Sequence, residues 1–186
     1  QGARMGDDVV AANAILMNFL LLISFGLDGI ANAAEVRVGN AYGQKNKASI
    51  LLSCKVATLW TVIFALIYSV VFLFWGSNII HIISDIDSVT SFAKQFIWWI
   101  ALLPLLSCWC YLLDGIYIGL TQAKAMRNGM IISTFAIFFP SWFMLQPLDN
   151  HGLWAAFSLF MLARGITLYL HFTQKVMKGQ ISQWAT

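Results

Sequence analysis

The sequence predicts an all-α membrane protein, a polytopic helical bundle with five transmembrane helices. Of its 186 residues, 60% are hydrophobic and only 10% are charged, whereas about 25% of a soluble domain is charged. The apolar residues form five runs, each long enough to cross ~30 Å of hydrocarbon as a helix. The runs do not alternate as transmembrane strands do, and a helix satisfies its own backbone hydrogen bonds in lipid.

The five spans follow one another along the chain, separated by joints. Their approximate bounds are residues 9–38, 56–75, 96–120, 130–148 and 153–172. Pro104 and Pro140 fall inside the third and fourth spans, where each removes a backbone donor and is expected to kink its helix. The second joint contains "NIIHIISDIDSV", which is amphipathic and is expected to lie along the outer surface of the membrane.

Charged residues in the joints predict the orientation of the chain. One set of alternate joints holds eight Lys and Arg, namely Arg37, Lys45, Lys47, Lys55, Lys124, Arg127, Lys175 and Lys178. The other set holds two, Arg4 and Lys94, together with Asp7, Asp8, Asp85, Asp87 and Asp149. The positive-inside rule places the first set in the cytoplasm. We therefore expect a multi-pass protein of the inner (plasma) membrane with a cytoplasmic C-terminus.

Two polar stripes interrupt the apolar spans. The first span carries Ser24, Asp28, Asn32 and Glu35 on one helical face. The third span carries Ser107, Tyr111, Asp114, Tyr117 and Thr121 on one face. Stripes on separate spans can line a shared cavity, so we take these nine side chains, together with Arg164 in the last span, as its candidate lining.

The two aspartates lie at similar depth in the membrane. Asp28 precedes Arg37 by nine residues, about 14 Å, and Asp114 precedes Lys124 by ten residues, about 15 Å. Both are therefore near the midplane, where an ionised carboxylate costs about 2.5–3.5 kcal/mol or more. Burial favours the neutral acid and a bound cation favours the carboxylate. Groups balanced in this way are candidate cation- or proton-binding residues.

A structural reading of the same residues remains open. Each aspartate can instead pair with Arg164, the only basic residue deep in a span, or with donors at a helix end. An arginine partner does not exclude function, because it can set the protonation of an aspartate in a working site. Glu35 lies one turn from the cytoplasmic end and can snorkel to the interface, so its role in the cavity is that of an accessory at most.

The sequence does not favour an enzyme. It contains neither H-E-x-x-H nor G-x-S-x-G. An aspartyl dyad is disfavoured because the G-x-G-D motif of intramembrane aspartyl proteases is absent, with Leu27 in place of the second glycine. We expect no cofactor, and no metal other than a possible Na⁺ at Asp114. The net charge of +3 is too small to indicate a nucleic-acid partner.

Three segments resemble multidrug and toxic compound extrusion (MATE) transporters. "AANAILMNFLLLISFGLDGIANAAEVRVGNAYG" resembles their eighth transmembrane helix, "WCYLLDGIYIGLTQAKAMRN" the tenth and "NHGLWAAFSLFMLARGITL" the twelfth. The LDG pairs and "MRN" are most similar to the branch called DNA-damage-inducible protein F (DinF). The resemblance extends over the whole chain, and the order and spacing of the segments make it specific.

The resemblance implies a twelve-helix transporter of two six-helix lobes. Residues 1–186 would form the C-terminal lobe, helices eight to twelve, with the N-terminal lobe and the seventh helix missing from the chain. Asp114 occupies the place of an acidic residue that helps to form a cation site on the tenth helix of the family. A cation role for Asp28 is instead our inference from its stripe.

The expected function is therefore secondary active export of organic, often cationic, compounds in exchange for H⁺ or Na⁺. Its partners would be a small-molecule substrate, membrane lipid and the missing lobe. A lipid-linked precursor flippase of a related superfamily is the first alternative, but it would favour a basic cavity, and Arg164 is the only candidate. The second alternative is a non-transporting membrane partner, for which substitution of either aspartate would be silent or stabilising.

Overall fold

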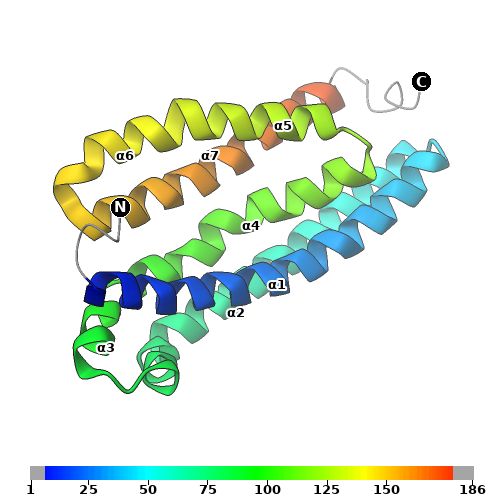
Figure 1. The fold of residues 1–186 in the computed structure, drawn as a ribbon. Coiled ribbons are helices and arrows are strands. Elements are labelled where there is room, and N and C mark those ends of the chain that lie inside the picture. Colours follow the sequence, from blue (N-terminus) through cyan, green and yellow to red (C-terminus); the bar gives the residue numbers. More distant parts are fainter. Residues whose placement is uncertain (1–6, 178–186) are drawn as a thin grey trace.

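The computed structural model describes residues 7–177, which fold into helices without a strand among them (Figure 1). Three long helical segments are followed by a helical hairpin, and each segment runs antiparallel to the one before it. The elements are α1 (Asp7–Gly43), α2 (Lys47–Ile83), α3 (Asp87–Lys94), α4 (Ile97–Gly119), α5 (Ala123–Ile132), the π-helix η2 (Ser133–Phe138), α6 (Phe139–Leu145), the 3₁₀ turn η3 (Gln146–Leu148) and α7 (Asp149–Met177).

Helix α4 is the centre of the bundle. It packs against α1, α2 and α7, and 61% of its apolar span is buried, against 28%, 22% and 33% for the other three spans. The leg formed by α5, η2 and α6 packs on the far side of α7 (Figure 1). A polar residue on α4 is therefore held between neighbouring helices, whereas one on the outer face of α1 or α2 is not.

Four segments of the described chain are long and apolar enough to cross a membrane. The fourth, Ala123–Lys175, has 53 residues and folds back on itself, so the fourth and fifth predicted spans are its two antiparallel legs (Figure 1). The reversal contains Pro147 and Asp149, whose φ is 49°. Gly152 allows it to close, because a Cβ there would lie 2.0 Å from the Leu145 carbonyl oxygen. The predicted class, an all-α polytopic membrane protein, is confirmed.

The helices continue past the predicted spans at the first joint. Helix α1 runs to Gly43 and α2 begins at Lys47, so only a short turn separates them. Asn46 caps α2, and its side-chain oxygen accepts a hydrogen bond from the Ser49 N–H at 3.1 Å. The sequence-based bounds follow the apolar runs, whereas the helix ends follow this cap and the positive φ of 53° at Lys45.

The second joint also differs from its prediction. Residues 78–83 of the amphipathic segment continue α2 rather than lying apart from it. The short helix α3 follows and buries Val89, Thr90 and Ala93 against α1 and α2. The surface helix at this end is thus shorter than expected and begins later in the sequence.

The two prolines are accommodated differently. Pro104 is buried within α4, which continues as one helix on both sides of it. Pro140 follows the π-helical segment η2, where the Phe139 N–H donates to the Thr134 carbonyl five residues earlier. A local π-bulge re-registers the backbone hydrogen bonds next to the position where proline lacks a donor.

The joints sort to the two ends of the bundle as their charges predict. The α1–α2 turn, the α4–α5 turn and the end of α7 lie together at one end (Figure 1). That end carries the basic residues Lys45, Lys47, Lys124, Arg127 and Lys175, and the opposite end carries Asp85, Asp87, Lys94 and Asp149. Arg4 and Lys178 lie outside the described residues. Which end faces the cytoplasm remains a prediction.

Candidate functional site

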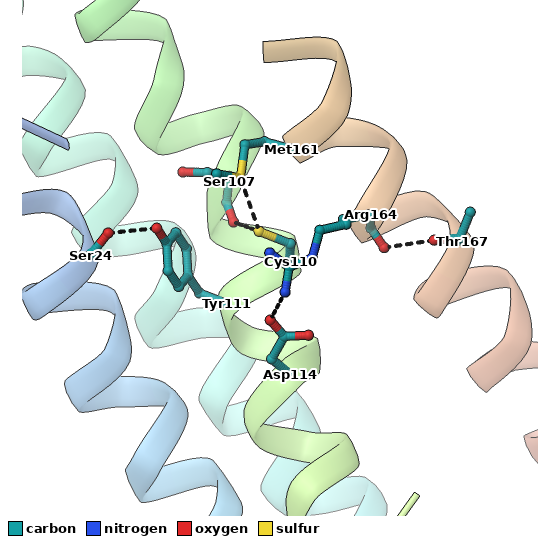
Figure 2. Close-up of polar contacts among 8 residues, drawn as sticks. All are labelled: Ser24, Ser107, Cys110, Tyr111, Asp114, Met161, Arg164 and Thr167. Atoms are coloured by element: carbon teal, nitrogen blue, oxygen red, sulfur yellow. Dashed lines mark hydrogen bonds and ion pairs between the residues drawn. The ribbon is translucent and has the colours of Figure 1, made fainter. Parts of the chain in front are cut away.

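An ion pair joins α4 to α7 in the middle of the bundle. Arg164 Nη2 donates to Asp114 Oδ2 (Figure 2). The side chains of Arg164 and Asp114 are 17% and 21% exposed, so both charged groups are largely buried between the helices. The structure therefore shows, for Asp114, the arginine partner that the sequence left open. The guanidinium of Arg164 neutralises the charge of an ionised Asp114.

Close packing of α4 and α7 positions this pair. A Cβ on Gly165 would lie 2.9 Å from Cβ of Trp109, so glycine at this position allows the helices to approach. One turn away, Cys110 Sγ contacts Met161 Sδ at 3.7 Å (Figure 2). Arg164 precedes Gly165, where the two helices pack tightly, and its guanidinium reaches Asp114 on α4.

Helix α1 approaches α4 from another side. A Cβ on Gly115 would lie 2.3 Å from the Ala31 carbonyl oxygen, and one on Gly119 would lie 2.6 Å from that of Glu35. Ser24 Oγ and Tyr111 Oη share a hydrogen bond of 2.6 Å across this interface (Figure 2). The predicted stripes on the first and third spans are therefore in direct contact.

Asp28 lies one turn beyond Ser24 on α1 and is exposed. It makes no salt bridge within residues 7–177, but it is within electrostatic range of Asp114 and Tyr111. The two aspartates therefore lie close enough to interact, and within residues 7–177 Arg164 is the only basic side chain deep in a span. Two carboxylates and one guanidinium leave this part of the bundle with a net negative charge when all are ionised.

The remaining stripe residues have different surroundings. Ser107 is buried and donates to the Leu103 carbonyl at 2.7 Å, while Thr121 is exposed in the turn after α4 and bonds the Leu120 carbonyl at 2.7 Å. Tyr117 is fully buried and faces α7, where it donates to the Leu168 carbonyl at 3.1 Å. On α1, Asn32 is exposed and Glu35 is half-buried. The α4 stripe thus contacts two helices: Tyr111 bonds α1, whereas Asp114 and Tyr117 bond α7.

Two groups of polar contacts that the sequence did not predict extend the interfaces between the long helices. His171 Nδ1 lies 2.7 Å from Tyr117 Oη, extending the polar α4–α7 contact toward the basic end. At the opposite end, the Asn13 and Asn150 amides exchange hydrogen bonds of 2.8 and 3.1 Å, and Trp154 Nε1 donates to Asn13 Oδ1 at 3.0 Å. The spacing could have predicted both groups. Asn13 precedes Ser24 by eleven residues and His171 follows Arg164 by seven, so each pair shares one face of its helix.

Comparison with known proteins identifies the family. The family model described as MatE matches residues 2–143. The chain belongs to the MatE family. DNA damage-inducible protein F of Escherichia coli (strain K12) is 39% identical over 167 residues, which are 90% of this chain and 36% of that protein. The probable multidrug resistance protein NorM of Photorhabdus laumondii subsp. laumondii is 22% identical over 188 residues, covering 97% of this chain and 41% of the relative.

A solved structure of a MatE-family protein shares the fold. The crystal structure of the eukaryotic MATE transporter AtDTX14 superposes with a TM-score of 0.84 over 94% of this chain at 16% identity. The chain covers 40% of that structure. The predicted resemblance to the MATE family and to its DinF branch is confirmed, and the chain spans less than half the length of each of these relatives.

Proposed function

We propose that residues 1–186 form the C-terminal lobe of a secondary active antiporter that exports organic, often cationic, compounds in exchange for H⁺ or Na⁺. The Asp114–Arg164 pair on the central helix of the bundle carries this proposal. Membership of the MatE family and similarity to a probable multidrug resistance protein support it. The N-terminal lobe would supply the opposite wall of the cavity.

Asp114 is the proposed exchange site, and Arg164 is its resident counter-ion. A proton or Na⁺ that binds Asp114 competes with the guanidinium, so ion binding and release of Arg164 are linked. Because Arg164 lies on α7 and Asp114 on α4, breaking their contact loosens one helix pair. An ion that binds one packing of the helices better than another shifts the population between inward- and outward-facing states.

Asp28 is the second proposed ion-binding group. Its exposure and its electrostatic range to Asp114 suit a carboxylate that draws a cation toward the pair. The Ser24–Tyr111 bond holds α1 and α4 in register one turn away. Asn32 and Glu35 continue the same face toward the basic end, where they are proposed to line the entrance of the cavity.

The proposed location is the inner (plasma) membrane, with the basic end and the C-terminus in the cytoplasm. The support is the gathering of Lys45, Lys47, Lys124, Arg127 and Lys175 at one end of the bundle. A lipid-linked precursor flippase fits less well, because Arg164 already meets Asp114 and is not free for a pyrophosphate.

The decisive test is export by the full-length protein in vesicles, with sodium and proton gradients imposed separately. We expect Asp114→Asn to abolish ion-coupled export and Asp28→Asn to weaken it. Export is compared at equal amounts of folded protein, because Asp114→Asn leaves Arg164 without its counter-charge. Asp85→Asn, at an exposed position between α2 and α3, is the matched control. Undiminished export by the Asp28→Asn/Asp114→Asn double variant would refute the mechanism and would favour a non-transporting role for these residues.

A further inference from the structure

A second feature of the bundle lies away from the ion pair. A groove of about 530 Å³ runs between α2, α4 and α7. A second hollow of about 480 Å³ adjoins it toward the basic end. The two share Cys54, Thr58, Tyr169 and Phe172, so they adjoin along the helices, and together they are here called the α2–α4–α7 groove.

The walls of the α2–α4–α7 groove are apolar. Side chains from the three helices that line it include Trp109, Leu112, Leu113, Ile116, Leu162 and Ile166. Two of the three hydroxyl groups in its lining are already engaged, since Thr58 Oγ1 donates to the Cys54 carbonyl at 2.8 Å and Thr173 Oγ1 to the Leu170 carbonyl at 3.0 Å. A water molecule would find too few polar partners there, so the groove is suited to a hydrocarbon chain.

The groove faces away from the proposed transport cavity. On α4, Trp109, Leu112 and Ile116 each lie two residues from Tyr111 or Asp114, which is about 200° around a helix. Its rim is open, since Trp109, Ile166 and Tyr169 are 38%, 48% and 55% exposed. An apolar, outward-opening groove on a membrane-spanning bundle offers a complementary surface to a lipid acyl chain.

The position of Lys55 indicates which lipid headgroup would suit the groove. Lys55 lines the part of the groove nearest the basic end and lies eight residues, about 12 Å, along α2 from Lys47. A lysine at this depth extends its ammonium toward the interface while its stem covers apolar surface. The headgroup phosphate of a lipid whose tail lies in the groove would meet that ammonium.

We infer that the α2–α4–α7 groove binds an acyl chain of an anionic phospholipid, with the phosphate held at Lys55. Apolar lining, outward opening and the single lysine at one end support this occupant together. Anionic lipids are attracted to basic segments at the membrane surface. The inference rests on the membrane-spanning fold and is independent of the coupling ion.

The test is photo-cross-linking of lipid to the full-length protein in nanodiscs. The probes are phosphatidylglycerol with a diazirine in its acyl chain and the matching phosphatidylcholine, and mass spectrometry locates the labelled peptides. We expect label on residues 54–58, 109–116 and 162–173, with phosphatidylglycerol favoured about fivefold, the factor expected for one Lys near an anionic surface. Lys55→Ala should remove this preference, and Lys47→Ala, on the same helix outside the groove, should keep it.

A second pair of variants tests the groove itself. Ile166→Trp fills it and should lower labelling by both lipids, whereas Leu159→Trp, exposed on α7 outside the groove, should not. Equal labelling by the two lipids, an equal loss in Lys47→Ala and Lys55→Ala, or label spread evenly over the exposed apolar faces would each overturn the inference. Cross-links from the groove to a second copy of the protein instead of lipid would do the same.

Discussion

Removal of Arg164 provides the sharpest test of the ion pair. Arg164→Gln leaves the Asp114 carboxylate between α4 and α7 without its counter-charge. Breaking a buried ion pair from one side costs about 3–5 kcal/mol. Because the two side chains retain 17% and 21% exposure, we expect a loss at the lower end of this range, about 3 kcal/mol, in the free energy of unfolding.

The double variant separates charge from packing. Arg164→Gln/Asp114→Asn replaces both charges with amides, so no charge is left unpaired. We therefore expect it to recover about 2 kcal/mol relative to Arg164→Gln alone, within the range of coupling energies for residues in contact. Unfolding by sodium dodecyl sulfate in mixed micelles measures all three variants against the parent. The control is Arg127→Gln, an exposed arginine whose guanidinium bonds the neighbouring Asn128, with an expected change below about 0.5 kcal/mol.

One result would refute this reasoning. If the double variant is no more stable than Arg164→Gln, the charge of Asp114 is not what Arg164 compensates. The contact between Arg164 and Asp114 would then be one arrangement among several, and the proposed competition between the coupling ion and the guanidinium would lose its basis. Recovery by the double variant supports a charge-coupled pair and leaves the choice between H⁺ and Na⁺ to the transport assay.

Three further predictions concern packing, the interhelical bond and orientation. Gly115→Leu should destabilise the bundle by about 3 kcal/mol or more, because a Cβ there lies 2.3 Å from a carbonyl of α1; melting in detergent measures the loss. Ser24→Ala and Tyr111→Phe should each cost about 1 kcal/mol, and their combination should cost less than the sum, since one hydrogen bond joins them. A cysteine-free protein carrying Lys124→Cys should be labelled by an impermeant thiol reagent only after the cells are opened, whereas Asp149→Cys should be labelled on intact cells.

Each of these predictions has a control or an outcome that would contradict it. Gly29→Ala is the control for the packing variant, because nothing lies within 4 Å of a Cβ there, and we expect it to be neutral or stabilising. Additive losses in the Ser24 and Tyr111 variants would show that their hydroxyls act separately. Labelling of the Lys124→Cys protein on intact cells would reverse the proposed orientation.

Apolar runs and their spacing were sufficient to predict the membrane-spanning helices. Burial in lipid leaves no other way to satisfy the backbone of a lone span, so α1, α2, α4 and the α5–α7 hairpin follow from composition alone. Helical periodicity also placed Ser24 and Tyr111 on faces that meet. The alternation of the joints placed the first and third spans in the same direction across the membrane, and α1 and α4 do run the same way (Figure 1).

Only the tertiary structure decided which aspartate Arg164 meets. Asp28 and Asp114 lie at similar depth, so spacing along the chain does not distinguish them; the approach of α7 to α4 at Gly165 does. The helix ends likewise depended on the Asn46 cap and on the backbone at Lys45. Local periodicity determines which side chains share a face, whereas the distance between faces depends on contacts between residues 50 or more positions apart, which no local pattern records.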